Sequence, residues 1–251
     1  FVFVAACNLL LRFTRRGKVT PLPFLRNKLS MLGGGLIGLN WGIFVWAVES
    51  ERVVEASLGY FMNPLMNVFL GVVFLGEALR KAQWLAVTFA AAGVLWLTIS
   101  LNAFPWVSLT LAISFALYGL IRKVAPASPL EGLRVETSVL LIPAVAFVLL
   151  RGNASENLTS DTATVILILL SGAVTGIPLL LFASSAKRIP LSILGILQYI
   201  TPTIQFLLGV FAYNETFDSN RLIGYSIIWF GLVIFALDSF QFASNQTSHE
   251  K

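Results

Sequence analysis

Polar side chains recur at helical spacing inside two of the most apolar stretches of the sequence. The three in each stretch are separated by three and four residues, and the second set follows the first by 138 positions: Tyr60, Asn63, Asn67, and then Gln198, Thr201, Gln205. This spacing puts each set on one face of a helix. Amides and hydroxyls donate and accept hydrogen bonds without carrying a fixed charge. Such a stripe suits the binding of a polar organic molecule or the bonding of one apolar helix to another.

We predict that the two stripes line a shared solute-binding cavity, together with neighbouring polar and aromatic side chains. The predicted binding residues are Asn40, Trp41, Tyr60, Asn63, Asn67, Gln198, Tyr199 and Gln205. The alternative is that the amides only tie helices together, each contributing about 1 kcal/mol or less. Because the pattern occurs in both stretches, we favour binding for the paired set.

Pro64 and Pro202 lie inside the same two stretches. A proline within a helix removes one backbone donor and clashes with the preceding turn, so we expect a kink at each. Each kink could also serve as a hinge or free carbonyl groups for a solute.

Glu136 is the acidic residue that lies furthest inside a predicted membrane helix. Its position near the helix N-terminus and close to Arg134 is explained by the helix dipole and by charge pairing. The functional alternative is a proton carrier that couples transport to a pH gradient.

Several kinds of site are missing from the sequence. There is no phosphate-binding G-x-x-x-x-G-K-[ST] loop, so we expect no direct use of ATP. No metalloprotease or serine-hydrolase motif occurs. One cysteine and one histidine are too few for a Cys- or His-rich metal site. We therefore predict a protein that is not an enzyme and that needs no metal and no cofactor.

Composition places these residues in membrane helices. The chain is 57% hydrophobic and only 12% charged, which is typical of a protein surrounded by lipid. The apolar stretches are long enough to cross a bilayer as helices. We predict an all-α membrane bundle with nine helices, at residues 1–12, 29–48, 53–75, 83–101, 105–121, 133–150, 163–183, 190–212 and 221–240.

An internal repeat organises these helices. Residues 34–93 align without gaps to residues 172–231, and the matched residues include Gly34 with Gly172, Gly38 with Gly176, Pro64 with Pro202, Glu77 with Glu215, and Gly93 with Gly231. Gly34, Gly38 and Gly42, and likewise Gly172 and Gly176, are expected to allow close helix packing. Glu77 and Glu215 are expected to cap or pair at helix ends. We predict one repeat at 1–102, a second at 103–243 and a cytoplasmic tail at 244–251. The offset predicts that one helix precedes residue 1 in the intact protein, which would then have ten.

The basic residues indicate the orientation in the membrane. With nine crossings, all 17 Lys and Arg residues fall on one side except Arg52, Arg151 and Arg221. Because basic loops stay in the cytoplasm, we expect a cytoplasmic C-terminus. This topology also accounts for the basic loop at 12–28 without nucleic acid. Five helices per repeat is an odd number, so the repeats run in opposite directions, as in many secondary transporters.

Longer runs of sequence resemble a known family. These runs are NWGIFVWAV at 40–48, EASLGYFMNPLMNVFLGVVFLGE at 55–77, QWLAV at 83–87, FALYGLIRK at 115–123 and QYITPT at 198–203. They are similar to the RarD-type permeases of the EamA branch of the drug/metabolite transporter superfamily. The resemblance implies a bacterial inner-membrane permease with two five-helix inverted repeats. Asn214 departs from the family, which usually has glycine there.

We therefore expect a secondary transporter that moves a small organic solute, a drug or a metabolite, by alternating access, with export favoured over import. The alternative is a non-transporting membrane sensor or partner subunit whose polar helix faces bind another protein. The expected partners are the solute and the lipid bilayer, with no nucleic acid and no ATP. The sequence indicates neither the identity of the solute nor the oligomeric state.

Overall fold

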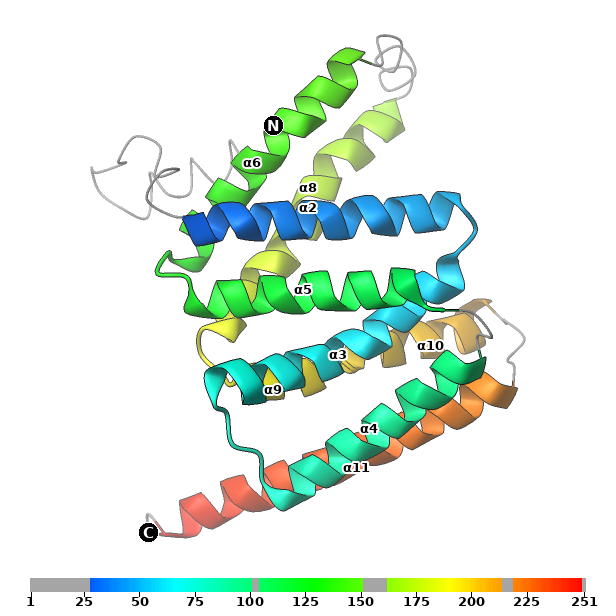
Figure 1. Cartoon of the computed structure of the whole chain (residues 1–251), viewed down its shortest axis with the longest axis vertical. Helices are drawn as coiled ribbons and strands as arrows, with labels where there is room; N and C mark the ends of the chain where they lie inside the picture. Colours follow the sequence, from blue (N-terminus) through cyan, green and yellow to red (C-terminus); the bar gives the residue numbers. More distant parts are fainter. Residues whose placement is uncertain (1–27, 101–103, 151–161, 214–218, 250–251) are drawn as a thin grey trace. The chain divides into compact units, whose positions relative to one another are not determined.

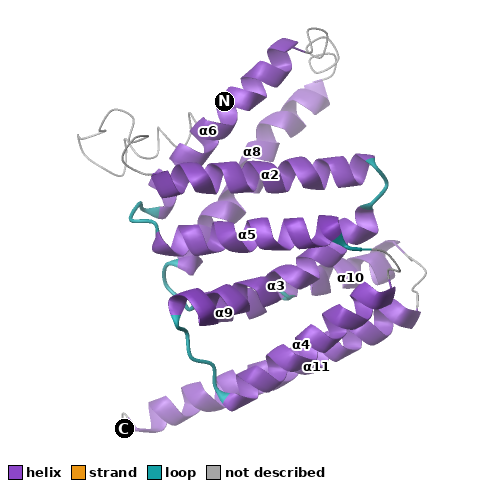
Figure 2. Cartoon of the chain, viewed as in Figure 1, coloured by secondary structure: helices purple, strands orange, loops and turns teal. Residues whose placement is uncertain are grey.

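The computed structural model describes residues 28–100, 104–150, 162–213 and 219–249, which form helices joined by short loops and turns (Figure 1). Within these ranges no strand occurs (Figure 2). The helices are α2 Lys28–Glu49, α3 Val53–Leu75, α4 Lys81–Ser100, α5 Trp106–Val124, α6 Pro129–Leu150, α8 Thr162–Ala186, α9 Leu191–Leu197, α10 Ile200–Tyr213 and α11 Ser219–His249.

Most predicted helices coincide with observed ones to within a few residues. Among the described residues, six segments are long and apolar enough to cross a membrane: Lys28–Glu49, Val53–Leu75, Lys81–Ser100, Trp106–Val124, Leu191–Leu208 and Ser219–Phe242. A multi-pass helical membrane protein is thereby confirmed. The helix predicted at 1–12 lies outside the described residues, so nine spans and a ten-helix repeat stay predictions.

The chain divides into two compact units. Unit 1 is formed by residues 1–41 and 117–189, and unit 2 by residues 42–116 and 190–251. The division runs through α2 and α5, so each of these helices contributes one part to each unit.

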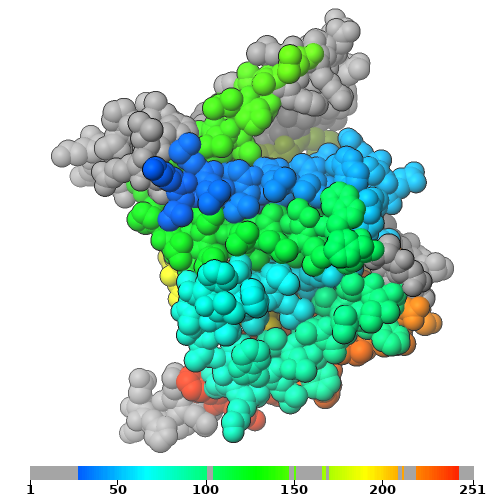
Figure 3. All heavy atoms as spheres, viewed as in Figure 1, coloured from blue at the N-terminus to red at the C-terminus, as the bar shows by residue number. Residues whose placement is uncertain are grey.

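Glycines bring helices of unit 2 into close contact. α4 and α11 lie side by side (Figure 1). A Cβ on Gly93 would lie 2.7 Å from the Gly224 carbonyl oxygen, and one on Gly231 would lie 2.7 Å from that of Ala86. Only glycine permits these approaches. On the face in Figure 3, side chains of α3 and α4 fill the space between their two ribbons.

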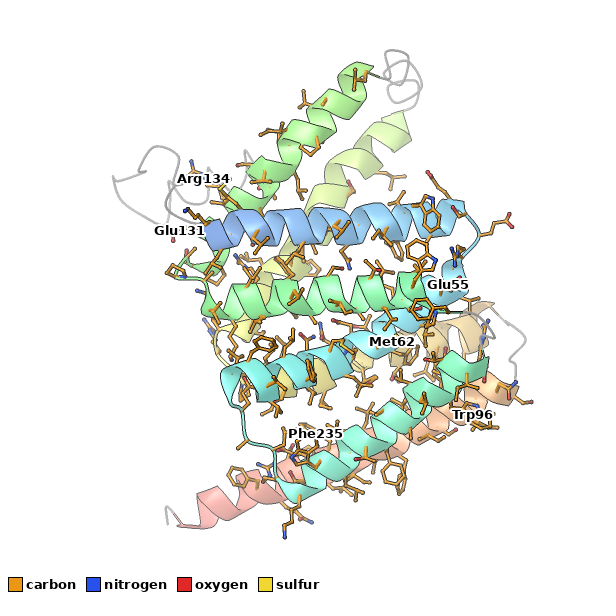
Figure 4. All side chains as sticks on the ribbon, viewed as in Figure 1. Glu55, Met62, Trp96, Glu131, Arg134 and Phe235 are labelled. Atoms are coloured by element: carbon orange, nitrogen blue, oxygen red, sulfur yellow. The ribbon has the colours of Figure 1, made fainter. Side chains whose placement is uncertain are left out.

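The core of unit 2 lies between α3, α4 and α11. Met62 on α3 and Phe235 on α11, both labelled in Figure 4, are each 7% exposed. Leu58, Phe61, Ala90 and Val94 pack in the same cluster as Met62, and the other buried members are Ala112, Tyr199 and Ile228. This apolar packing holds α3 in a fixed position against its neighbours.

In unit 1 the first part of α2 packs on α6. A Cβ on Gly34 would lie 3.1 Å from the Cα of Glu136, and one on Gly38 would lie 2.4 Å from the Leu140 side chain. The predicted packing role of these glycines is therefore confirmed. Gly42, in the part of α2 that belongs to unit 2, has no described neighbour within 4 Å of its Cβ position, so the close packing predicted for it is wrong.

The helix predicted at 190–212 is broken in two. α9 ends at Leu197 and α10 begins at Ile200. Pro202 has no N–H with which to bond the carbonyl of Gln198, four residues earlier. The N–H of Thr201 bonds that carbonyl instead, at 3.1 Å. The kink predicted at Pro202 is thus a break that precedes it, whereas α3 continues as one helix across Pro64.

Candidate functional site

Three of the predicted binding residues meet in unit 2. Asn67 Nδ2 donates to Gln198 Oε1 at 2.6 Å, and Asn63 Nδ2 donates to the same oxygen at 3.2 Å. Asn67 Nδ2 also lies 3.5 Å from Asn63 Oδ1. Asn67 is fully buried and Asn63 is 7% exposed. We call Asn63, Asn67 and Gln198 the amide cluster; it joins the polar face of α3 to the break between α9 and α10.

The amide cluster leaves hydrogen-bonding capacity unused. Two donors fix the Gln198 oxygen, while its Nε2 group makes no hydrogen bond to any described residue. Oδ1 of Asn67 and the hydroxyl of Tyr199 are buried without a partner. Buried polar groups are nearly always hydrogen-bonded, so an unused set of donors and acceptors is what a polar ligand would satisfy.

Close contact between α3 and α9 positions the amide cluster. A Cβ on Gly195 would lie 2.7 Å from the carbonyl oxygen of Pro64 and 2.8 Å from the Cβ of Asn67. Glycine at 195 therefore lets α9 approach α3 closely enough for the side chain of Gln198, three residues on, to reach the two asparagines.

A half-buried carboxylate caps the first turn of α9. The Glu77 carboxylate accepts hydrogen bonds from the N–H of Leu191 at 2.7 Å, the N–H of Ser192 at 2.8 Å and the Ser192 hydroxyl at 2.7 Å. An acid at a helix N-terminus satisfies free donors and interacts favourably with the helix dipole. Gly71 leaves room for the carboxylate, since a Cβ there would lie 2.6 Å from Glu77 Oε2. Glu77 therefore caps a helix, which is one of the two predicted roles, but that helix is α9, 114 positions away in sequence. Glu215 lies outside the described residues.

The other predicted residues of unit 2 do not join the amide cluster. Tyr60 is 41% exposed and packs edge-on against Phe44. Gln205 is exposed on α10, beyond the break. Because α9 and α10 are separate helices, the spacing that related Gln198 to Gln205 in a continuous helix no longer places them together. Tyr199 and Pro64 are buried beside the cluster, and Pro202 is buried one turn beyond it.

In unit 1 Trp41 lines a cavity of about 280 Å³. Asn40, the residue before Trp41 on α2, is half-buried and is not among the residues that line this cavity. The cavity is mainly apolar, and its polar walls are Thr137 on α6 with Ser171 and Thr175 on α8. These three residues were not predicted from the sequence. The spacing of four between Ser171 and Thr175 was a usable signal, although hydroxyls in membrane helices commonly bond their own backbone.

Glu136 forms an ion pair with Arg122, and not with Arg134 as its sequence position suggested. Arg122 Nη1 donates to Glu136 Oε1 at 3.1 Å, and the Tyr118 hydroxyl donates to Oε2 at 3.1 Å. Both charged side chains are almost fully buried, at 1% and 2% exposure. Arg134 and Glu131 lie near the start of α6 (Figure 4).

The Arg122–Glu136 pair is held by its surroundings. Arg122 Nη2 donates to the carbonyl of Pro129 at 2.6 Å. Gly132 has no side chain, and a Cβ there would overlap the Arg122 guanidinium. Protonation of Glu136 would leave the Arg122 cation buried without a counter-ion, which is costly. The pair therefore has a structural role that a proton carrier would have to give up during its cycle.

The described residues contain no group of three His, Cys, Asp or Glu side chains suited to a metal ion.

Comparisons with known proteins identify the family of the chain. The EamA-like transporter family matches residues 1–99 and 105–237. Protein RarD of Streptomyces exfoliatus is 44% identical over 93% of this chain and 76% of its own length. The uncharacterized transporter YojE of Bacillus subtilis is 42% identical, with coverages of 85% and 72%. Protein RarD of Escherichia coli is 42% identical, with coverages of 81% and 70%.

A solved crystal structure shares the fold, with a TM-score of 0.66, 18% identity, and coverage of 96% of this chain and 86% of the other. At that identity the likeness speaks for the fold alone. The relatives named above are bacterial proteins, two of them RarD and one a transporter by name. Together with the apolar helices, they indicate a multi-pass transporter of the bacterial inner membrane rather than an enzyme. The chain therefore belongs to the EamA-like transporter family, as a RarD-type permease.

Proposed function

We propose that this permease is a secondary transporter that exports a small organic solute, a drug or a metabolite, by alternating access, and that the amide cluster of unit 2 binds the solute. The observation that carries the proposal is the convergence of Asn63 and Asn67 on one oxygen of Gln198. Two donors on one acceptor fix the amide plane of Gln198 and leave its NH₂ group for another partner.

The chemistry of the cluster defines the kind of solute. The free NH₂ of Gln198 donates to a carbonyl, carboxylate or similar acceptor, while Asn67 Oδ1 accepts a hydrogen bond. Neither group requires a charged solute. A broken helix at membrane depth needs protein or a cavity around its free backbone groups, and transporters place substrate sites at such breaks.

Two inverted repeats would supply the motion. The family matches at 1–99 and 105–237 support repeats at 1–102 and 103–243, followed by a tail at 244–251. Five helices per repeat and basic loops on one side put the C-terminus in the cytoplasm. Rocking of one repeat against the other would open the solute site to each side in turn.

Transport would draw its energy from a gradient rather than from ATP. Glu136 is the candidate proton carrier, and Arg122 is the cation that must be neutralised in another way when Glu136 takes up a proton. The Glu136→Gln variant tests this role. We expect it to lose any dependence of flux on a pH gradient, and retention of that dependence would exclude Glu136 as the carrier.

The test of the solute site is flux through proteoliposomes that contain the purified chain. A library of drugs, amino acids and metabolites is first screened by thermal shift, and hits are then assayed for gradient-driven movement. Asn67→Ala and Gln198→Ala should each reduce flux at least tenfold while leaving folded protein in the membrane. Gln205→Ala is the matched control, because this amide is exposed and outside the cluster.

Equal flux in all three variants would remove the amide cluster from the solute site. If the folded chain moves no solute under any gradient, the alternative function gains support, namely a membrane sensor or partner subunit. The polar helix faces would then bind another protein.

A further inference from the structure

A cation lies against two adjacent tryptophans at the turn from α2 to α3 in unit 2. The Arg52 guanidinium carbon is 5.6 Å from the ring centre of Trp46 and 5.1 Å from that of Trp106. The two rings are 5.3 Å apart and inclined by 43°. Both distances from the guanidinium are within the range of cation–π attraction.

A carboxylate completes the site. Glu55, in the first turn of α3 (Figure 4), accepts a hydrogen bond through Oε1 from Nε of Arg52 at 2.7 Å, and the same oxygen forms an ion pair with Nη2 of Arg52 at 2.7 Å. Its second oxygen, Oε2, is buried and has no hydrogen-bond partner. The Glu55 carbonyl accepts from the Ser108 hydroxyl at 2.6 Å, which ties the start of α5, with Trp106, to the start of α3. We call Trp46, Trp106 and Glu55 the tryptophan box.

The backbone holds Arg52 at the tryptophan box. Glu51 has φ of 58°, the only positive φ among described residues other than glycine. This left-handed residue reverses the chain so that the N–H of Arg52 bonds the Ala47 carbonyl at 2.8 Å. Arg52 therefore folds back over Trp46. A residue in this conformation carries a conformational cost, which fixed local structure must offset.

We propose that the tryptophan box is a binding site for the ammonium group of an organic cation, and that Arg52 is a built-in occupant which such a ligand displaces. Ring faces and a carboxylate all present negative potential, which is the chemistry that recognises ammonium groups. The unused Oε2 of Glu55 offers an acceptor that Arg52 does not satisfy. The Arg52 side chain is 31% exposed, so its path to water is short.

This assignment goes beyond the proposed function, because it does not depend on solute transport or on the amide cluster. Once Arg52 has left, the box contains no positively charged group that would hold an anion, and the Glu55 carboxylate would repel one. An ammonium group can come from a free solute or from the headgroup of phosphatidylethanolamine, and the experiment separates the two sources.

The experiment uses the whole chain, labelled with 5-fluorotryptophan, in nanodiscs of phosphatidylglycerol at constant ionic strength. Tetramethylammonium is titrated and ¹⁹F resonances are recorded, with Trp46 and Trp106 assigned from Trp→Phe variants. We expect these two resonances to shift on binding, while that of Trp84 does not. Arg52→Gln should tighten binding about tenfold, because the ligand no longer competes with two cation–π contacts and an ion pair.

Adding Glu55→Gln to Arg52→Gln should abolish the shifts, and Arg221→Gln, another exposed arginine, should leave them as in the unaltered chain. If Arg52→Gln does not fold, the unaltered chain and Arg52→Lys are compared, and both should bind more weakly when Glu55 is replaced. Weaker binding in phosphatidylethanolamine discs identifies the lipid headgroup as a competing ligand, and equal binding identifies a free solute. Shifts that are absent, shared with Trp84 or indifferent to Glu55 overturn the assignment.

Discussion

Replacing Gly195 by alanine should separate α9 from α3. The new Cβ would lie 2.7 Å from the Pro64 carbonyl oxygen and 2.8 Å from the Cβ of Asn67. Carbon atoms pack comfortably at roughly 3.5–4.0 Å, so the two helices must move apart by roughly 1 Å. Neither contact is with a flexible side-chain end that could turn away.

The size of the effect follows from this overlap. Forcing a methyl group into packed structure costs about 1–3 kcal/mol. A shift of roughly 1 Å would also stretch the 2.6 Å bond between Asn67 and Gln198 beyond hydrogen-bonding distance. We therefore expect Gly195→Ala to lower the free energy of unfolding by about 1–3 kcal/mol and to reduce transport along with stability.

Gly42→Ala is the matched control, since Gly42 also lies in a helix of unit 2 and has nothing within 4 Å of its Cβ position. Alanine favours a helix over glycine by about 1 kcal/mol, so this variant should be as stable as the original chain or more so. Reversible unfolding in mixed micelles measures both. If Gly195→Ala is as stable as Gly42→Ala, the close contact between α3 and α9 is wrong, and so is our account of how the amide cluster is positioned.

Three further predictions concern charged groups, and the same unfolding assay checks them. Glu136→Gln should lower the free energy of unfolding by about 3–5 kcal/mol, because Arg122 is left buried without its counter-ion. Replacing both Arg122 and Glu136 by leucine should recover most of that loss. A Glu136→Gln variant as stable as the original chain would contradict this. Glu77→Gln should lower the free energy of unfolding by about 1–2 kcal/mol and speed amide hydrogen exchange in the first turn of α9. An unchanged exchange rate there would argue against the cap. Burial, and then the charge of Arg122, lower the pKa of Lys187, and Glu131 opposes them. At pH values between that lowered pKa and the usual value of about 10.4, the unfolded chain holds a proton on Lys187 that the folded chain has released. The free energy of unfolding, relative to that of Lys187→Met, should therefore rise with pH across this range. A relative free energy of unfolding that falls with pH would refute the assignment.

The helices were predictable because lipid imposes one simple requirement on the backbone. A spanning segment must satisfy its own hydrogen bonds and present apolar side chains over about 20 residues, so hydropathy alone locates it. The segments at 53–75 and 221–240 illustrate this, since the structure has helices at Val53–Leu75 and Ser219–His249. The membrane class and the transporter family were predictable for the same reason and from local sequence runs.

The contacts between helices were less predictable. The polar face with Asn63 and Asn67 followed from helical spacing, but the inclusion of Gln198 and the exclusion of Gln205 depended on the break before Pro202. A proline predicts a lost hydrogen bond, and only the neighbouring helices decide whether the helix bends or breaks.

By itself, the sequence determined where the helices lie, which of their faces are polar, and the family to which the chain belongs. Tertiary structure alone decided that Arg122 is the partner of Glu136, that Glu77 caps α9, and that Arg52 lies against both Trp46 and Trp106. These pairs are 14, 114, 6 and 54 positions apart in sequence, beyond the reach of neighbouring turns on one helix. Helix packing, set by glycines that admit a second backbone, fixes which side chains meet.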